Sequence, residues 1–181
     1  VATRFTARTG GRVEFSGVVS DTGGLTVGNT IIEGNATIPG INVEGRGTVV
    51  LSGNNTYAGN TEVTHGTLLV NNTAGSGTGT GGVNVQSGAT LGGSGMIIAS
   101  DAFATVTINS GGILPPHTTP TGTGGLTIGG GGLTLNAGAL LNFNIGAPGV
   151  SDIVHLTGVG NSLNLSGNAT LNLTNVGGLT V

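Results

Sequence analysis

The stretch GLTIGGGGLTLNAGALLNFNIG (residues 125–146) contains three short segments of alternating apolar and polar residues, separated by glycine. In the last segment Leu141 and Phe143 alternate with Asn142 and Asn144, so a strand here has one apolar and one polar face. The three segments fit three strands of one coil of a parallel β-solenoid. Such a coil needs about 20–25 residues.

The same alternation recurs along the chain, for example in GVNVQSG (82–88), SLNLSG (162–167) and ATLNLTN (169–175). Apolar residues at helical spacing are not sustained anywhere, and glycine interrupts almost every window. A sandwich or barrel built of hairpins is the alternative all-β architecture. Its two-residue turns favour Asn-Gly and Asp-Gly, and the chain contains neither dipeptide. We therefore predict an all-β protein, a parallel β-solenoid of roughly seven to nine coils.

The apolar residues of these segments are predicted to form the interior stack. They are Leu51, Val63, Leu68, Val83, Val85, Val106, Ile108, Leu133, Leu135, Leu141, Phe143, Leu163, Leu165, Leu171 and Leu173. Outward Asn and Thr side chains are expected to form ladders of like residues from coil to coil.

The composition agrees with stacked coils. Only 6% of the residues are charged, and like charges repeated every ~4.8 Å along a solenoid would repel. The 39 glycines suit corners, where the backbone needs positive φ. A net charge of −3 argues against nucleic-acid binding, and the absence of cysteine excludes disulfides and thiol chemistry. No apolar run reaches the ~18 residues of a membrane span.

The only tyrosine, Tyr57, lies in LSGNNTYAGNTEVTHGTLLVNN (51–72), in what looks like a surface turn. Residues 45–97 closely resemble the passenger-associated repeat of bacterial autotransporters, with Ala58 in place of the usual Thr. The family pattern runs G-x-G-T-L-x-L-S-G-x-N-T-Y-T-G-x-T-x-V-x-x-G-T-L and, after a glycine-rich corner, G-A-T-L. The repeat-motif residues that we assign are Gly47, Thr48, Leu51, Ser52, Gly53, Asn55, Thr56, Tyr57, Gly59, Gly66, Thr67, Leu68, Gly88, Ala89, Thr90 and Leu91.

The resemblance implies a right-handed parallel β-helix that is exported and then displayed on the cell surface or released. In that family the repeat is linked to efficient secretion and folding. Tyr57 would then cap a corner, with its ring over the stacked backbone and its hydroxyl bonded to a neighbouring turn. Downstream, Ser151-Asp152 resembles the usual continuation of the family pattern, whereas Pro116-His117 departs from it.

We interpret residues 1–181 as a single solenoid segment. Residues 1–44 would form N-terminal coils, residues 45–97 the repeat, and residues 98–181 further coils that stop within a repeat.

Residue patterns for catalysis are weak. The acidic residues are scattered, whereas polysaccharide-cleaving β-helices need clustered carboxylates. They are Glu14, Asp21, Glu33, Glu44, Glu62, Asp101 and Asp152. The histidines, His65, His117 and His155, are also scattered, and His117 among prolines is expected in an exposed loop. We therefore expect no catalytic, metal or cofactor site.

The sequence favours an extracellular structural or adhesive scaffold, on a bacterial surface or secreted. The alternative is a self-assembling subunit of an extracellular matrix fibre, and a polysaccharide-active enzyme is a distant third. The partners we expect are a second copy bound end to end, or a host-surface or polysaccharide ligand. We expect neither nucleic-acid binding nor a membrane span in this segment.

Overall fold

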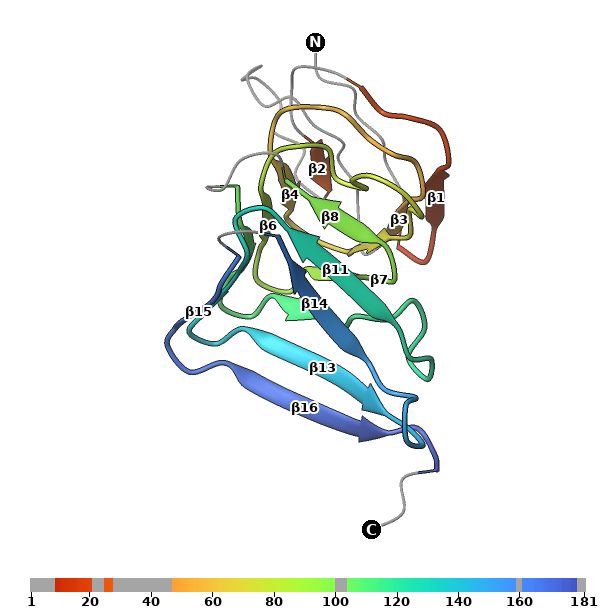
Figure 1. Ribbon diagram of the computed structural model, residues 1–181, viewed down its shortest axis with the longest axis vertical. Coiled ribbons are helices and arrows are strands. Elements are labelled where there is room, and N and C mark those ends of the chain that lie inside the picture. Colours follow the sequence, from red (N-terminus) through yellow and green to blue (C-terminus); the bar gives the residue numbers. More distant parts are fainter. Residues whose placement is uncertain (1–8, 21–24, 28–46, 100–103, 159–160, 179–181) are drawn as a thin grey trace.

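The computed structural model describes residues 9–20, 25–27, 47–99, 104–158 and 161–178. These residues form β-strands and turns, and none of them belongs to a helix that could cross a membrane. The strands form three sheets, and within each sheet the strands of successive coils follow one another along the long axis of the molecule (Figure 1). The prediction of an all-β fold is confirmed, while the division of the chain into three parts stays a prediction.

The seven-stranded sheet contains, in spatial order, β1 (Arg12–Phe15), β3 (Thr48–Leu51), β5 (Thr67–Val70), β7 (Thr90–Gly93), β10 (Ile113–Leu114), β13 (Leu140–Ile145) and β16 (Thr170–Asn175). The six-stranded sheet contains β15 (Leu163–Ser166), β12 (Leu133–Asn136), β9 (Val106–Ile108), β6 (Val83–Val85), β4 (Thr61–Val63) and β2 (Leu25–Val27). The three-stranded sheet contains β14 (Ile153–Thr157), β11 (Gly125–Gly129) and β8 (Met96–Ile98).

Neighbouring strands in all three sheets are parallel. Residues 125–146 supply one strand to each sheet, namely β11, β12 and β13. Each of these pairs with the strand one coil further on, β14, β15 and β16 respectively. The parallel β-solenoid predicted from this stretch is therefore confirmed.

The length of a coil varies along the molecule. Thr67 pairs with Thr90, 23 residues later, which is within the predicted range. Leu140 pairs with Thr170, 30 residues later. The extra residues lie in the segment of the chain that connects a strand of the seven-stranded sheet to the next strand of the six-stranded sheet. The later coil forms β14 there, whereas the earlier one has a glycine-rich connection without a strand at residues 71–82.

The interior holds one continuous cluster of buried apolar side chains. Along the seven-stranded sheet, Leu68 lies directly under Leu91, and both are fully buried. The predicted core residues that the structure buries are Leu51, Val63, Leu68, Val83, Val85, Val106, Ile108, Leu133 and Leu135. Burying one such side chain contributes about 1.5–3 kcal/mol, so this stack is a main source of stability.

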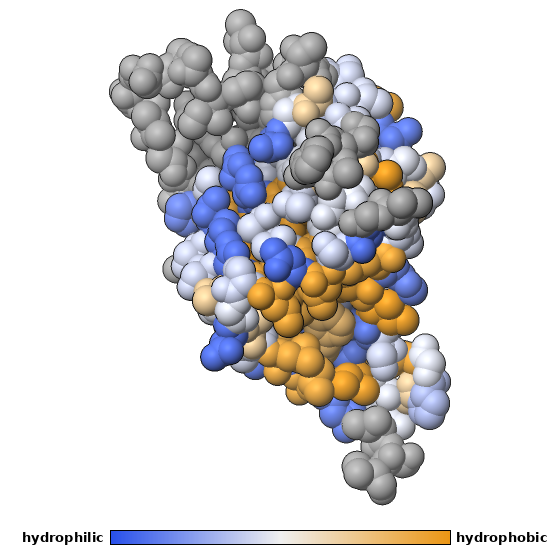
Figure 2. All heavy atoms as spheres, turned by 60° about the vertical axis from the view of Figure 1, so that its left-hand side comes forward, coloured by the Kyte–Doolittle hydropathy of each residue, from blue (hydrophilic) through white to orange (hydrophobic). Residues whose placement is uncertain are grey.

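The prediction that the last coil is buried was wrong. Leu163 and Leu165 on β15 are 54% and 58% exposed, and Leu171 and Leu173 on β16 are 57% and 60% exposed. They continue the inward-facing columns, but among the described residues no strand lies beyond β15 or β16 in their sheets. Figure 2 shows the resulting apolar surface towards this end of the molecule. On the preceding coil, Leu141 and Phe143 are only half-buried.

Glycine occupies one corner in four successive coils, at Gly66, Gly88, Gly111 and Gly138. All four have φ between 71° and 83°. The amide of Gly88 donates to the carbonyl of Gly111, and the amide of Gly111 donates to that of Gly138. This left-handed backbone is easily reached by glycine, so the expected role of glycine at corners is confirmed here.

Polar ladders run along the outside of the solenoid. Asn136 donates to Asn109 at 2.8 Å, and Ser166 donates to Asn136 at 2.7 Å. On the seven-stranded sheet, Asn172 donates to Asn142 at 2.8 Å. Two of these three hydrogen bonds join asparagines at equivalent positions one coil apart, so the expected ladders of like residues are confirmed for Asn.

Candidate functional site

The corner between β3 and β4 contains the most distinctive residues of the repeat motif, and Asn55 connects three coils there. Its Oδ1 accepts from the amide of Val19 at 2.7 Å, and its Nδ2 donates to the carbonyl of Gly77 at 2.6 Å. Val19 precedes Asn55 by 36 residues and Gly77 follows it by 22. Asn55 is 2% exposed; its hydrogen bond to Gly77 is buried, and the one from Val19 is partly buried. This side chain therefore bonds its own coil to the coils on both sides.

Tyr57 lies in the same corner, but its ring is buried in the core rather than placed on the surface. It is 2% exposed and belongs to the interior apolar cluster. Its hydroxyl lies 2.7 Å from Oγ1 of Thr61, which in turn donates to the carbonyl of Thr78 at 3.4 Å. The expectation of a surface turn was wrong. The hydroxyl partner is a strand residue of β4, not a neighbouring turn.

Burial raises the pKa of the Tyr57 hydroxyl far above its usual range, although the hydrogen bond with Thr61 acts in the opposite direction. The hydroxyl is therefore protonated under ordinary conditions and is available as a donor. If Tyr57 donates to Thr61, the hydroxyl of Thr61 is free to donate to Thr78. The result is a short buried chain of hydrogen bonds from one coil to the next.

The glycine-rich run of the next coil makes room for the Tyr57 ring. A Cβ at Gly79 would lie 2.8 Å from Cδ2 of Tyr57 and 2.2 Å from its carbonyl oxygen. Gly79 also has a φ of 66°, which disfavours any other residue. The amide of Thr80 donates to the Tyr57 carbonyl at 2.9 Å. The aromatic residue and the glycine-rich corner of the motif are thus complementary parts of one packing arrangement.

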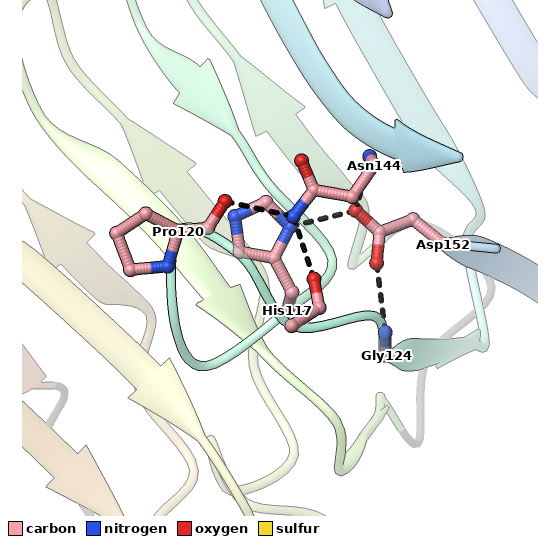
Figure 3. A network of polar contacts seen from close by, with 6 residues as sticks. His117, Pro120, Gly124, Asn144 and Asp152 are labelled. Carbon is pink, nitrogen blue, oxygen red and sulfur yellow. Dashed lines mark hydrogen bonds and ion pairs between the residues drawn. The ribbon is translucent and has the colours of Figure 1, made fainter. Parts of the chain in front are cut away.

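A second polar network connects two later loops and one strand around Asp152 (Figure 3). Oδ2 of Asp152 lies 2.6 Å from Nδ1 of His117 and 2.7 Å from the amide of Asn144. Oδ1 accepts from the amide of Gly124 at 2.7 Å. An ionised carboxylate only accepts, so we assign the shared proton to His117 Nδ1. Asp152 is 6% exposed, so its charge is balanced by these contacts rather than by water.

Asn144 extends this network to the loop after β10. Its side-chain amide donates to the carbonyls of Pro120 at 3.0 Å and Gly122 at 2.6 Å. Asp152 and Asn144 together therefore fix residues 115–124 against β13 and the start of β14.

The prediction that His117 lies in an exposed loop was wrong. The residue is 9% exposed, and its ring pairs with a carboxylate 35 residues away. A histidine–carboxylate pair resembles part of a catalytic triad, but a triad also needs a nucleophile. Among the hydrogen bonds of the described residues, the His117 ring contacts Asp152 and no hydroxyl. The arrangement is suited to holding loops in place.

The other described carboxylates lie in separate contacts. Glu14 on β1 pairs with Arg12 at 2.9 Å and accepts from Ser52 at 2.8 Å. The hydrogen bond from Arg12, and after it the one from Ser52, lower the pKa of the exposed Glu14 carboxyl. Glu62 on β4 accepts from Asn84 on β6. The other acidic residues, Asp21, Glu33, Glu44 and Asp101, lie outside the described residues. Within the described ranges, no group of His, Asp and Glu could hold a metal ion.

The motif residues predicted from the sequence lie on three successive strands of the seven-stranded sheet and on the corners between them. Thr67 stacks on Thr90, and Leu68 stacks on Leu91. Thr48 and Leu51 are on β3, Thr67 and Leu68 on β5, and Thr90 and Leu91 on β7, while Gly47, Ser52, Gly53, Asn55, Thr56, Tyr57, Gly59, Gly66, Gly88 and Ala89 are in the connections.

Several buried polar residues were not singled out from the sequence. Asn72 donates to the carbonyls of Ala74 and Gly75, and its Oδ1 accepts from the amide of Met96 at 2.9 Å. Ser76 accepts from the amide of Ile98 at 3.1 Å. The one available signal was the second Asn after a strand, which occurs in both LSGNN (51–55) and LVNN (69–72).

Comparison with known proteins bears on this corner. Residues 43–70 match the family model of the passenger-associated-transport-repeat. The matched segment contains β3, the Asn55–Tyr57 corner, β4 and β5. The resemblance to an autotransporter passenger repeat is therefore confirmed for this segment. Comparisons with curated proteins and with solved structures gave no match.

Proposed function

We propose that this chain is part of a rigid, non-catalytic scaffold that a bacterium exports and that holds other parts of the same protein away from the cell. The observation that carries the proposal is the passenger-associated-transport-repeat at residues 43–70, placed within a continuous parallel solenoid. A repeat of autotransporter passengers implies a secreted or surface-exposed protein.

The stiffness of the scaffold would come from its hydrogen-bond ladders. Each coil is joined to the next by parallel strand pairs in the sheets and by side-chain ladders such as Asn109–Asn136–Ser166. A solenoid of this kind is stabilised by contacts between neighbouring coils, so a rod forms without contacts between distant coils.

The repeat corner would help each new coil to form on the previous one. Asn55 bonds to the preceding coil through Val19 and to the following coil through Gly77. Tyr57 then packs beneath the glycine-rich run around Gly79. Such cross-coil contacts favour ordered growth of the solenoid as the chain leaves the cell, which fits the role of the repeat family in transport.

The polar contacts support a scaffold rather than an enzyme. Glycosidases place two carboxyl groups about 5–9.5 Å apart, facing the substrate. Here Asp152 is buried and saturated by three hydrogen bonds, and Glu14 and Glu62 lie on strands of different sheets. We therefore propose a structural role for these acids.

Export can be tested in the source bacterium with an antibody raised against the purified chain. We expect labelling of intact cells, or the protein in the culture medium, while a cytoplasmic marker stays inaccessible. Labelling only after permeabilisation would contradict the proposal.

The role of the repeat corner can be tested in the same cells. Asn55→Ala is expected to reduce the exported amount at unchanged transcript level, because it removes both cross-coil bonds. The matched control is Asn172→Ala, which removes an exposed ladder amide and should leave export unchanged. Equal export of both variants would contradict a role of the repeat corner in export.

A subunit of a matrix fibre is the second candidate, because the parallel strand ladders of a solenoid can continue from one molecule to the next. Negative-stain electron microscopy over a concentration series separates the two functions. Dispersed particles support the scaffold, whereas uniform filaments support the fibre subunit.

A further inference from the structure

The outer side of the six-stranded sheet carries amide and hydroxyl side chains along its length. Its outward residues, from β4 to the end of β15, are Glu62, Asn84, Gln86, Thr107, Asn109, Thr134, Asn136, Asn164 and Ser166. Glu62 is the one ionisable group among them. The outer sides of the other two sheets differ, because Arg12 and Glu14 put charges on β1 while Met96 and Ile153 put apolar groups on β8 and β14.

Four of these side chains form a hydrogen-bonded ladder with a single direction. Gln86 donates to Oε2 of Glu62 at 3.4 Å, and Asn109 donates to Gln86 at 3.4 Å. Asn136 in turn donates to Asn109 at 2.8 Å. A carboxylate only accepts hydrogen bonds, so the amide beside Glu62 must donate, and its oxygen is left to accept from the next coil. Glu62 therefore orients all three amides in the same way.

The ladder leaves part of each amide free for a ligand. A side-chain amide has two N–H donors and two oxygen lone pairs. The ladder uses one donor and one lone pair of Gln86, Asn109 and Asn136. These side chains are only partly buried. Because the coils are spaced by ~4.8 Å, one donor and one acceptor recur on this surface at that interval.

Charge and spacing indicate which ligand fits. Asn84 and Gln86 both donate to Glu62, so this surface has no unpaired charge that would select a charged partner. A hydroxyl group both donates and accepts, so a neutral carbohydrate matches the free groups of the amides. The regular interval favours an extended chain with hydroxyls on every unit. Strands β4, β6, β9, β12 and β15 contain no aromatic residue on which one sugar could stack, so binding depends on many weak contacts.

We propose that the outer side of the six-stranded sheet binds a neutral, extended polysaccharide that lies along the axis of the solenoid. Successive sugars would contact Gln86, Asn109 and Asn136 on successive coils. Glu62 is a positioning residue, since it acts by orienting these amides. This activity goes beyond a scaffold, and it concerns the purified chain, so it does not depend on the proposed export.

Sedimentation with insoluble cellulose, an uncharged and extended β-1,4-linked glucan, tests the proposal. The purified chain should sediment with cellulose and stay in solution with starch granules, whose α-1,4-linked chains coil. Binding should change little between about 0.05 and 0.5 M NaCl, because no charge pairing is involved. Soluble cello-oligosaccharides should compete more strongly as they lengthen, whereas glucose should not compete.

A matched pair of double variants tests the location of the site. Asn109→Ala combined with Asn136→Ala should weaken binding to cellulose by about tenfold or more, the equivalent of one or two hydrogen bonds. The control is Asn142→Ala combined with Asn172→Ala, which removes a ladder pair from the outer side of the seven-stranded sheet. Binding of the control should be unchanged. Circular dichroism should show the same fold for both proteins.

Two conservative variants test the hydroxyl contacts and the role of Glu62. Thr134→Val removes an outward hydroxyl but keeps the shape and strand preference of the side chain, so it should weaken binding about threefold at an unchanged fold. Glu62→Gln allows either direction of the ladder, because an amide can donate as well as accept. It should weaken binding by a similar factor at an unchanged unfolding midpoint.

Four outcomes would overturn the inference. A chain that stays in solution with cellulose does not bind this class of polymer. Equal binding to starch contradicts the match to an extended chain. A steep loss of binding with salt indicates ionic contacts instead of neutral ones. Equal losses in the two double variants place the contact elsewhere on the molecule.

Discussion

The coils in the middle of the molecule and the last described coil have the same alternating pattern but opposite environments. Leu68 in TLLV (67–70) is fully buried, whereas Leu171 in TLNL (170–173) is 57% exposed. Both follow a threonine in the same sheet and point to the same side. The difference shows that a strand of a solenoid does not bury its own side chains. The coils stacked on both sides do so.

The middle coils also contain buried polar contacts between coils that the strands β15 and β16 of the last described coil lack. Asn55 and Tyr57 connect successive coils from inside, at 2% exposure. The side-chain hydrogen bonds of the last coil, such as Asn172 to Asn142, are exposed. We therefore expect the stability of the molecule to be highest in its middle and to decline towards the last coil.

Removing the Tyr57 ring should have the largest effect. Tyr57→Ala leaves a cavity in the middle coils and should lower the free energy of unfolding by about 3–5 kcal/mol. Tyr57→Phe keeps the ring and loses the Thr61 contact, so its cost should be about 1 kcal/mol. Urea unfolding followed by circular dichroism gives both values. Equal effects would show that the hydroxyl, not the ring, is what matters.

Gly79→Ala tests the complementary half of that packing. We expect it to destabilise the protein by about 1–3 kcal/mol, because of its positive φ and the close approach to Tyr57. In the double variant with Tyr57→Ala the two effects should be less than additive, because the steric conflict is partly removed. Full additivity in a double-mutant cycle would mean that the two residues are not coupled.

A matched pair of leucine substitutions tests whether the middle coils and the last described coil differ in stability. Leu68→Ala should cost about 2–5 kcal/mol. Leu171→Ala should cost less than about 1 kcal/mol, because its side chain is already largely in water. Urea unfolding followed by circular dichroism gives both values. A large loss for Leu171→Ala would contradict the contrast between the two regions.

Asp152→Asn should lower the free energy of unfolding by an intermediate amount. The side-chain amide of Asn has one oxygen, so it cannot accept hydrogen bonds from all three donors that the carboxylate binds. Hydrogen bonds to a charged group contribute about 1.5–3 kcal/mol, and we expect a loss of that order. Amide hydrogen exchange should show faster exchange at Gly124 and Asn144, while β5 and β7 keep their protection. Faster exchange throughout the molecule would contradict a network that stabilises only the loop at residues 115–124.

Glu14→Gln is the exposed counterpart and should have the smallest effect. The pKa of the Glu14 carboxyl is lowered by Arg12 and Ser52, so its stabilisation is present above the usual pKa of glutamate and is lost as the pH falls through the lowered value. Unfolding midpoints of the wild type and the variant should therefore differ slightly near neutral pH and converge in acid. If the difference between the two unfolding midpoints grows as the pH falls, the prediction is wrong.

The sequence was most informative where structure depends on local pattern. The alternation in residues 125–146 correctly predicted one strand for each of three sheets, and the glycines correctly marked corners such as Gly88 and Gly111. It was misleading where burial depends on distant residues. His117 follows two prolines and looks exposed, but its partner Asp152 lies 35 residues further along the chain.

The amino-acid sequence by itself determined the parallel solenoid, because strand alternation and glycine turns act over a few residues, and it identified the passenger repeat from its motif. Only the tertiary structure decided which of these residues are buried. Tyr57 is in the core because Gly79 of the next coil leaves room for its ring, and Leu171 is exposed because no described strand lies beyond β16. Burial is a property of stacking between coils, and residues that are equivalent within a coil differ when their neighbours along the axis differ.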